Sequence, residues 1–431
     1  MMAGERFRKS MEWLKRAEAR VPGASQTFSK GANQFVRGAS PLFLDRGQGA
    51  RVWDVDGREY LDTTMALCAV SLGYADPDVD AAVIGQLERG VIFTLPHPLE
   101  AEVAELLSRV IPCAEMVRFG KNGSDATSGA VRLARAFTGR DVIATCGYHG
   151  WQDWYVGTTT RSLGVPKSVR ALTRTFTYNR IETLEQLFDE HPGQVAAVIM
   201  EPVGIEAPRP QFLESVRELC TRHGTLLIFD EIVTGFRLAP GGAQEHFGVL
   251  PDLACFGKGM SNGYPLSALV GRREIMALLK EVFFSFTAGG ETVSLAACLA
   301  TIGKIEREAV IPHLWHHGET VRDRANRSAA ASGLAEVVRC VGLAPRTVMT
   351  FARDDGRPWW ELKSLFQQEC VRRGLLFTGA HNMALAHGAK EVDAVCRIYD
   401  EVFSLVADAV RRDNVASRLE GPPVEPVFRN P

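Results

Sequence analysis

Short apolar runs alternate with segments of helical spacing through the middle of the chain. Leu226–Phe229 is wholly apolar and stands between polar residues, which is typical of a strand buried on both faces of a sheet. Val195–Met200 and Leu253–Phe256 repeat this pattern, and Phe212–His223 between them has the apolar spacing of a helix. The alternation predicts an α/β fold with a mostly parallel sheet covered by helices.

More elements between about residues 115 and 305 follow the same alternation. The remaining predicted strands are Val117–Phe119, Val142–Ala144 and Ala268–Val270, and the remaining predicted helices are Ala126–Phe137 and Ser294–Ile305. Glycine and polar residues follow several of these strands, so we expect the polar side chains to gather at one edge of the sheet.

The two ends of the chain lack this regular alternation. Toward the N-terminus the predicted elements are helices over Arg6–Ala19, Asp76–Arg89 and Leu99–Val110 and a hairpin over Arg51–Leu61 that turns at Asp56-Gly57. Toward the C-terminus they are strands over Val337–Gly342, Val348–Phe351, Leu375–Phe377 and Met383–Ala386 and a helix over Val392–Val410. We therefore expect a second, smaller α+β region.

Composition and charge are those of a globular protein with a sizeable core. Of 431 residues, 46% are hydrophobic and 23% are charged, and the length favours two domains. The formal net charge of −2 gives no electrostatic reason to expect nucleic acid or an anionic membrane as a partner. No apolar stretch is long enough to span a bilayer, and the charged N-terminus lacks the apolar core of a signal peptide. The nine cysteines are scattered without a CxxC pair, which favours reduced thiols and a cytoplasmic location.

Two charged residues stand at strand ends, where open α/β sheets bind their ligands. Asp230 follows the Leu226–Phe229 run, and Lys258 follows Leu253–Phe256 between two glycines. A pyridoxal phosphate site requires these two groups, because the lysine forms a Schiff base and the acid keeps the pyridine nitrogen protonated. An isolated Asp/Lys pair is more often a capping acid and a surface lysine, so the prediction depends on what else the chain supplies.

A glycine-rich turn supplies a second part of such a site. Gly120–Thr127 lies between a predicted strand and a predicted helix, where backbone N–H groups and the helix N-terminus can bind a phosphate. Ser124 adds a hydroxyl group. No Gly-Lys-Ser/Thr sequence follows, so the turn is not a nucleotide-binding P-loop. Tyr148, just beyond another predicted strand, can stack on a pyridine ring.

Other residues are weaker evidence for hydrolysis, metal binding or dehydrogenase chemistry. Glu201 and Asp230-Glu231 each end a strand, and paired carboxylates can serve hydrolysis or metal binding, but no histidine stands beside either one. Three histidines between residues 313 and 317 share a helical face in a stretch that we expect to connect helices, without carboxylate or thiolate partners. We therefore expect no metal site. No GxGxxG follows an early strand, which argues against a dehydrogenase.

Along nearly its whole length the chain resembles the class III, or ω, aminotransferases, which are pyridoxal phosphate enzymes of fold type I. Within them it is most similar to the glutamate-1-semialdehyde aminomutase branch. The matching segments are Val52–Gly57, Asn122–Ala126, Arg132–Arg135, Tyr148–Gly150, Met200–Val203, Asp230–Arg237 and Phe256–Lys258. The resemblance implies a large cofactor-binding domain over residues 66–310, a smaller α+β domain over 311–431, and an N-terminal segment, 1–65, that joins the smaller domain.

By this resemblance three residues would be catalytic. Lys258 would form the Schiff base and carry a proton as general acid and base, and Asp230 would pair with the pyridinium nitrogen. Tyr148 would stack on one ring face and Val233 would pack on the other. The rest of the expected cofactor-binding set is Gly123, Ser124, His149, Glu201 and Thr287.

Thr287 matches the threonine that family members extend to the phosphate of the neighbouring subunit. This implies a homodimer with two shared active sites, and isologous dimers are the commonest oligomers.

The chain also departs from the family pattern. Gly289–Thr292 stands where Ser-Gly-Asn-Pro is usual, and Asn122–Ser124 stands where Ser-Gly-Thr is common. The arginines that bind a substrate carboxylate in relatives have no clear counterpart here, although Glu206 matches the glutamate that pairs with one of them. These departures favour an acceptor other than glutamate semialdehyde, such as a sugar-like or carbocyclic carbonyl compound.

We therefore expect an aminotransferase of a biosynthetic pathway that moves an amino group from an amino acid, a small-molecule donor, to a ketone or aldehyde acceptor by a ping-pong mechanism through pyridoxamine phosphate. The alternative is an aminomutase, which returns the amino group to the same molecule. A third hypothesis, a pyridoxal phosphate fold without turnover, is disfavoured because Lys258, Asp230 and Tyr148 are all present. The sequence identifies neither donor nor acceptor, nor any assembly beyond a dimer.

Overall fold

The computed structural model describes residues 6–427, and this part of the chain divides into two compact units. The larger unit consists of Cys68–Val70 and Pro77–Ile311. The smaller unit consists of Ser71–Asp76, the described residues up to Leu67 and those from Pro312 onward. That the chain forms separate domains with limits near residues 65 and 310 stays a prediction, because compactness does not test independent folding.

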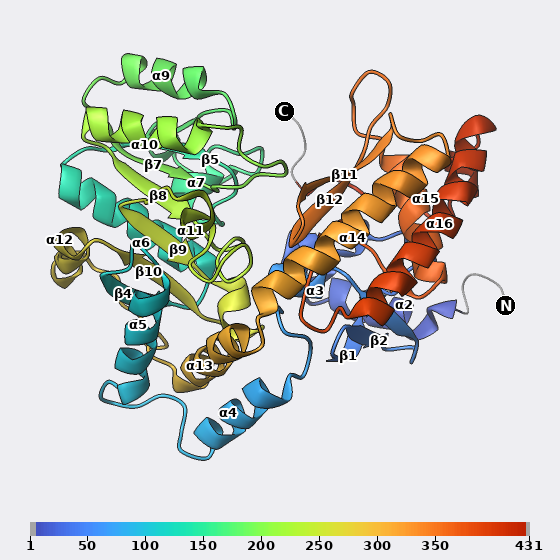
Figure 1. The fold of residues 1–431 in the computed structure, drawn as a ribbon, viewed down its shortest axis with the longest axis horizontal. Helices are drawn as coiled ribbons and strands as arrows, with labels where there is room; N and C mark the ends of the chain where they lie inside the picture. The colour runs from blue at the N-terminus through green and yellow to red at the C-terminus, as the bar shows by residue number, and fades with distance from the viewer. Residues whose placement is uncertain (1–5, 428–431) are drawn as a thin grey trace. The chain divides into compact units, whose positions relative to one another are not determined.

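A seven-stranded sheet forms the core of the larger unit (Figure 1). Its spatial order is β4-β10-β9-β8-β7-β5-β6. The strands are β4 (Met116–Gly120), β5 (Val142–Cys146), β6 (Thr173–Thr175), β7 (Val195–Met200), β8 (Leu226–Asp230), β9 (Leu253–Phe256) and β10 (Ser267–Gly271). Strand β10 runs antiparallel to both neighbours and the other pairings are parallel, so the predicted mostly parallel sheet is confirmed.

Helices cover the sheet and bury its strands on both faces. Every residue of β5, β7, β8 and β9 is buried. Helix α6 (Gly123–Thr138) packs on the strands through Ala126, Ala130 and Leu133, and its small alanine side chains allow a close approach. Burial on both faces explains why these strands appear in the sequence as continuous apolar runs rather than as alternating patterns.

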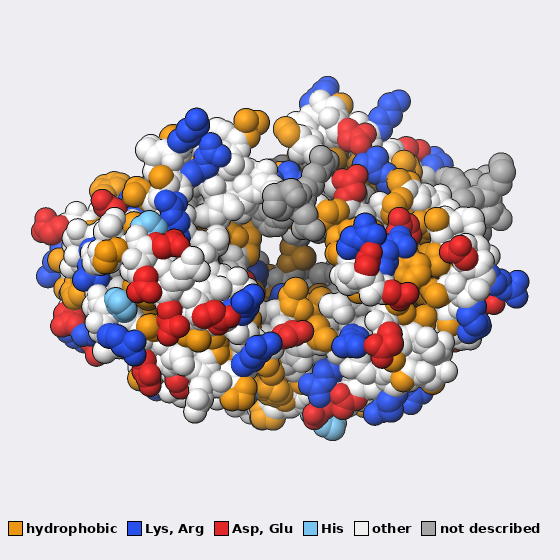
Figure 2. Space-filling model, turned by 90° about the horizontal axis from the view of Figure 1, so that it is seen from above, with side chains coloured by type: hydrophobic (Ala, Val, Ile, Leu, Met, Phe, Trp, Pro, Cys, Tyr) orange, Lys and Arg blue, Asp and Glu red, His pale blue; other side chains and the backbone are white. Residues whose placement is uncertain are grey.

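The other helices of the larger unit connect strands or flank the sheet (Figure 1). They are α4 (Pro77–Leu87), α5 (Pro98–Val110), α7 (Asp153–Val156), α8 (Lys167–Arg170), α9 (Ile181–Glu190), α10 (Phe212–His223), α11 (Ala243–Phe247), α12 (Arg273–Met276) and α13 (Thr292–Arg307). Within residues 6–427 no helix has the length and apolar character that crossing a membrane requires. Side chains of both charges are interspersed over the face drawn in Figure 2, in line with the small net charge.

The smaller unit contains two sheets and the long helices of the chain ends. The first sheet has the order β1-β2-β3-β13 and the second has the order β11-β12-β14. Their strands are β1 (Leu44–Gln48), β2 (Arg51–Asp54), β3 (Glu59–Asp62), β13 (Leu375–Leu376), β11 (Val338–Leu343), β12 (Arg346–Phe351) and β14 (Ala380–Asn382). The helices are α2 (Arg8–Glu18), α15 (Trp360–Arg372), α16 (Ala389–Arg411) and most of α14 (Val310–Ala331).

Two local predictions in this region are wrong. Met383–Ala386 is not a strand, because the ladder with β12 lies earlier, at Ala380–Asn382. The histidines between residues 313 and 317 do not connect helices but lie inside α14. Pro312 does not prevent this, because it occupies the first helical turn, where a backbone N–H has no intrahelical acceptor.

A left-handed turn precedes the larger unit. Every residue of α3 (Met65–Cys68) has a positive φ, between 45° and 73°. This conformation costs about 1–2 kcal/mol for each residue that carries a Cβ, so the surroundings must hold it. Asp62 contributes, because its Oδ1 accepts hydrogen bonds from the N–H groups of Thr64 at 2.7 Å and Met65 at 3.2 Å. The segment contains no glycine, and its sequence did not predict the turn.

Candidate functional site

A cavity of about 350 Å³ lies beyond the carboxyl ends of β4, β5, β7, β8 and β9. This is the edge at which open α/β sheets bind ligands, and the volume suits a small molecule. Eight residues that the sequence selected line it together: Gly123, Ser124, Tyr148, His149, Glu201, Asp230, Val233 and Lys258. Thr287 does not line it and lies on an exposed turn.

Lys258 enters the cavity from a strained turn. Strand β9 ends at Phe256, and the short helix η4 (Lys258–Ser261) begins at the lysine itself. The backbone of Lys258 has φ +42°, in the left-handed region that residues with a Cβ disfavour. Such strain is concentrated at functional positions, because the surrounding structure must be built to hold it.

Asp230, the last residue of β8, is a buried carboxylate that is hydrogen-bonded to His149. Its Oδ2 lies 2.8 Å from Nδ1 of His149, and the other ring nitrogen, Nε2, lies 3.1 Å from the carbonyl oxygen of Cys146. A carbonyl oxygen can only accept, so Nε2 carries a proton. The contact between Nδ1 and Oδ2 then needs a second proton, on His149 or on Asp230. The two side chains therefore share a proton away from water.

The N-terminus of α6 reaches the cavity through Gly123 and Ser124 and can bind an anion there. The first amides of a helix have no intrahelical acceptor, and the helix dipole places partial positive charge there. Asp125 binds the amides just before the helix, since its Oδ2 accepts from Lys121 at 3.0 Å and from Asn122 at 2.8 Å. The amides of Gly123 and Ser124 are left to face a ligand.

Gly150 lets the loop after β5 close on this helix end. Its φ is +107°, and a Cβ at this position would lie 2.3 Å from Oγ of Ser124. Thr127 supports the same approach, because its hydroxyl donates a hydrogen bond to the carbonyl oxygen of His149 at 2.8 Å. Only glycine meets both the backbone and the packing requirement here.

Tyr148 and two aliphatic residues form the walls of the cavity. The N–H of Tyr148 donates to Oε2 of Glu201 at 2.9 Å, which fixes the loop. Burial, together with the nearby carboxylates of Asp230 and Glu201, raises the pKa of Tyr148, so the phenol is neutral. Ile232 and Val233 supply apolar surface. An aromatic face and an aliphatic wall suit a flat heteroaromatic ring.

Glu231, the neighbour of Asp230, has a structural role rather than a place in the cavity lining. Its carboxylate is fully buried and accepts the N–H groups of Ala243 at 2.7 Å and Gln244 at 2.8 Å, at the start of α11. Burial raises the pKa of Glu231 despite these hydrogen bonds. Asp230 therefore lines the cavity, whereas Glu231 binds the start of α11. The two adjacent carboxylates do not form the acid pair that hydrolysis would need.

Several residues that the sequence did not select also line the cavity; they include Ala69, Lys121, Ile232, Tyr264 and Pro265. Lys121 and Ile232 lie inside motifs that contain selected residues, so their position was an available signal. Ala69 and Tyr264 belong to no motif, and only the fold brings them to the cavity.

The donor set fits pyridoxal phosphate group by group. The N-terminal amides of α6 suit the phosphate, and the carboxylate of Asp230, held by His149, suits a protonated pyridine nitrogen. Lys258 offers an amine for an aldehyde, and Tyr148 offers an aromatic face for the ring.

Comparisons with known proteins agree with this arrangement. The family model described as Aminotransferase class-III matches residues 35–386. The chain is 34% identical over 411 residues to the 3-aminobutyryl-CoA aminotransferase of Cloacimonas acidaminovorans (strain Evry), covering 94% of this chain and 96% of the relative.

The chain is also similar to a second curated relative and to a solved structure. The chain is 39% identical over 353 residues to the glutamate-1-semialdehyde 2,1-aminomutase of Roseiflexus castenholzii (strain DSM 13941 / HLO8), covering 74% of this chain and 81% of the relative. A solved structure, the PLP internal aldimine form of the FumI protein of Sphingopyxis sp. MTA144, is similar with a TM-score of 0.87. It is 29% identical and covers 97% of this chain and 99% of that one.

Proposed function

Because the chain belongs to the class-III aminotransferases, which use pyridoxal phosphate, we propose that it moves an amino group from an amino acid to a ketone or aldehyde. The cycle is ping-pong, so the donor leaves as its keto product before the acceptor binds. The observation that carries this proposal is the convergence of Lys258, Asp230 and the N-terminus of α6 on one cavity.

Each part of the cavity would hold one part of the cofactor. The amides of Gly123 and Ser124 would bind the phosphate, Asp230 would bind the pyridine nitrogen, and Tyr148 would cover one ring face. When bound, the cofactor acts as an electron sink that makes the Cα–H bond of an amino acid acidic.

His149 and Cys146 position the carboxylate for this task. The Cys146 carbonyl holds Nε2 of the imidazole, so Nδ1 stays directed at Oδ2 of Asp230. The oriented imidazole fixes the Asp230 carboxylate through Oδ2 and leaves Oδ1, which also accepts the N–H of Ile232, for a further partner.

Lys258 would hold the cofactor through Nζ and then act on the substrate. Once a substrate amine takes its place, the freed amine of Lys258 could accept the proton from the substrate Cα and deliver it to the cofactor carbon from which the lysine was displaced. The short helix η4 begins at Lys258 and would keep this amine near the reacting centre.

We also propose that the active unit is a homodimer in which Thr287 reaches the phosphate held by the partner subunit. Thr287 is exposed and lies outside the cavity of its own chain, which supports a role elsewhere. Large apolar side chains are exposed close to Thr287 in the sequence, at Phe283 and Phe286. Others are exposed on the connection between α4 and α5, at Ile92, Phe93 and Leu95. Exposed apolar side chains of this kind are typical of a subunit interface.

An aminomutase is the second candidate, because the 39% identical relative from Roseiflexus castenholzii bears that name. In that case the amino group would return to a different carbon of the same molecule, and no separate acceptor would be needed.

A donor half-reaction tests the proposal. The purified, cofactor-loaded protein is mixed with single amino acids, and the visible absorbance of the cofactor and the released keto acid are measured. We expect one common donor to release keto acid in a one-to-one ratio to active sites. A loaded protein that no amino acid converts would contradict a transaminase and favour the aminomutase.

A further inference from the structure

Lys121 and Glu291 form an ion pair at the wall of the cofactor cavity. The Lys121 Nζ lies 2.8 Å from Oε2 of Glu291, and the side chains are only 15% and 13% exposed. Water screens such a pair less than an exposed one, so the contact holds its two residues in a fixed relation. Neither residue has a part in the chemistry described so far.

The lysine end of the pair belongs to the phosphate-binding turn. Lys121 lines the cavity directly before Asn122, Gly123 and Ser124. Its own N–H is held by Asp125 of helix α6. Both the backbone and the side chain of Lys121 are therefore anchored, and a displacement of this residue would displace the amides that follow it.

The glutamate end caps another helix. Oε1 of Glu291 accepts the N–H of Val293 at 2.7 Å, and Oε2 accepts the hydroxyl of Ser294 at 2.6 Å, at the first turn of α13. Burial acts to raise the pKa of Glu291, but the hydrogen bonds from Lys121 and Ser294 hold that pKa below its ordinary value. The carboxylate is thus charged and fully engaged, with Lys121 as its cationic partner.

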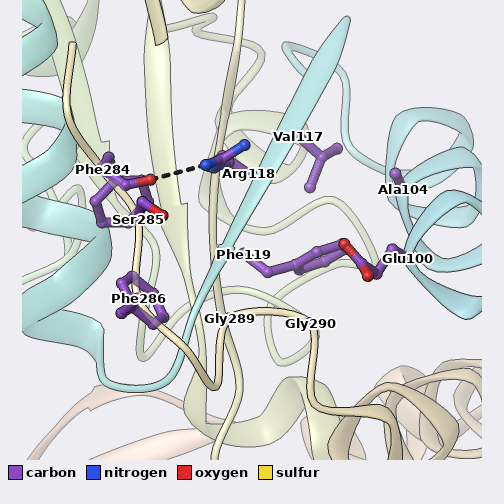
Figure 3. Close-up of a pocket in the computed structure, with 10 residues that line it drawn as sticks. All are labelled: Glu100, Ala104, Val117, Arg118, Phe119, Phe284, Ser285, Phe286, Gly289 and Gly290. Atoms are coloured by element: carbon purple, nitrogen blue, oxygen red, sulfur yellow. Dashed lines mark hydrogen bonds between the residues drawn. The ribbon is translucent and has the colours of Figure 1, made fainter. Parts of the chain in front are cut away.

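Hydrogen bonds also fix the beginning of the segment 283–291, which contains Thr287. Figure 3 shows the Arg118 guanidinium donating to the carbonyl oxygen of Phe284, and the two residues, 2.9 Å apart at these atoms, both line a cavity of about 270 Å³. Arg132 of α6 donates to the carbonyl oxygen of Phe283 at 2.6 Å. Strand β4 and helix α6 thus hold the start of this segment, and Lys121 holds its end.

We propose that the Lys121–Glu291 pair is a positioning element of the phosphate site. It fixes the amides of Gly123 and Ser124 against the N-terminus of α13 and against the segment that carries Thr287. The inference rests on the proposed function only in taking the α6 N-terminus as the place of the cofactor phosphate.

A different role for Lys121, direct attraction of the phosphate by its charge, leads to the opposite result at Glu291. Neutralising the glutamate would then free the lysine charge and strengthen cofactor binding. If the pair acts by position, neutralising either partner weakens binding. The sign of the effect at Glu291 therefore separates the two roles.

The test measures dissociation constants of the apo-protein for pyridoxal phosphate and for pyridoxal, which lacks the phosphate. Lys121→Met and Glu291→Gln should each weaken pyridoxal phosphate binding about tenfold, as expected for a lost charge-assisted hydrogen bond of about 1.4 kcal/mol. Binding of pyridoxal should stay unchanged.

The double variant should bind pyridoxal phosphate no more weakly than the worse single variant, because both changes remove the same interaction. Lys121→Arg keeps the ion pair and should retain most of the affinity.

Arg109→Met is the matched control, since Arg109 forms an exposed ion pair with Glu306 of the same helix, α13. It should leave both constants unchanged. Tighter binding by Glu291→Gln, equal losses for both ligands, or independent losses in the double variant would each overturn the proposal. Wild-type protein that binds the cofactor but releases no keto acid would contradict the proposed function and leave this test valid.

Discussion

At the scale of single residues, the proposed chemistry depends on two side chains that the surrounding structure holds in place. The backbone of Lys258 is strained, and Asp230 is buried beside an imidazole that a carbonyl oxygen orients. Strained or buried arrangements of this kind cost folding free energy, and in the proposed function they would fix the reacting atoms in return.

Replacing Lys258 tests the first of these arrangements. Lys258→Ala should abolish turnover and prevent borohydride from attaching the cofactor covalently, because no other amine lies in the lining of the cavity except the paired Lys121. Mass spectrometry after borohydride treatment measures the attachment. Lys280→Ala, at an exposed lysine, is the control. Trapping at full yield in Lys258→Ala would show that another lysine is the attachment point.

His381 lies on β14 in the smaller unit. The structure buries it completely, with Nδ1 2.8 Å from Oγ1 of Thr347 and Nε2 against the hydroxyl of Tyr399. Burial lowers the pKa of His381 to about 3, so the ring is neutral. It stabilises the smaller unit and is not available to bind a carboxylate.

This burial predicts a pH dependence of stability. The unfolded chain binds a proton at His381 near pH 6.5, but the folded chain does not until about pH 3. The contribution of His381 is therefore complete above pH 6.5 and is lost as the pH falls toward 3, by about 1.4 kcal/mol per pH unit. The stability advantage of wild type over His381→Gln should shrink by about 2 kcal/mol between pH 7.5 and pH 5 in urea unfolding. Parallel stability curves would contradict this assignment.

At the scale of elements, the site is built where loops after parallel strands meet the start of α6. The loop after β5 approaches this helix closely at Gly150, and the turn after β4 is held by Asp125. These contacts align amides from one element with aromatic and acidic groups from others. The site is therefore sensitive to changes that alter the spacing between elements.

Gly150→Ala tests this spacing. Its Cβ would collide with Ser124 Oγ and would force the loop and the helix apart, so we expect at least a tenfold loss of cofactor affinity. Gly164→Ala is the control, because Gly164 also has a positive φ, +90°, but has nothing within 4 Å of its Cβ position. That control should cost about 1–2 kcal/mol of stability and leave the affinity unchanged. Equal affinity losses in both variants would remove the collision as the cause.

At the scale of the whole molecule, the larger unit contains the cavity and the smaller unit contributes two sheets and long helices. The class is typically dimeric, and a site that takes Thr287 from a partner would couple assembly to cofactor binding. Such a shared site predicts that two defective subunits can complement each other.

Hybrid dimers test this sharing. Lys258→Ala homodimers should be inactive, and Thr287→Ala homodimers should bind the cofactor weakly in both sites. A hybrid of the two variants should contain one site with Lys258 and an intact Thr287 from the partner. We expect about half of the wild-type activity per dimer, at wild-type cofactor affinity. Activity no higher than the sum of the two homodimers would contradict sharing through Thr287.

Much of the fold was predictable because its signals are local. Strands buried on both faces require continuous apolar runs, and helices require apolar spacing, so six of the seven strands of the large sheet and helices α6, α10 and α13 follow from short windows of sequence. Strand β6 and helix α9 were not predicted. The strand at Met383–Ala386 was misplaced because the backbone pairing of Ala380–Asn382 depends on β12, which is remote in the sequence.

The sequence by itself determined the residue types and motifs of the site, from Asp230 and Lys258 at strand ends to the glycine-rich turn before α6. Only the tertiary structure decided which groups meet: His149 with Asp230, Gly150 with Ser124, and Lys121 with Glu291. The reason is physical. A motif reflects what a short segment needs for its own turn or strand, whereas proton sharing, close packing and ion pairing depend on distances between segments that the folded chain alone sets.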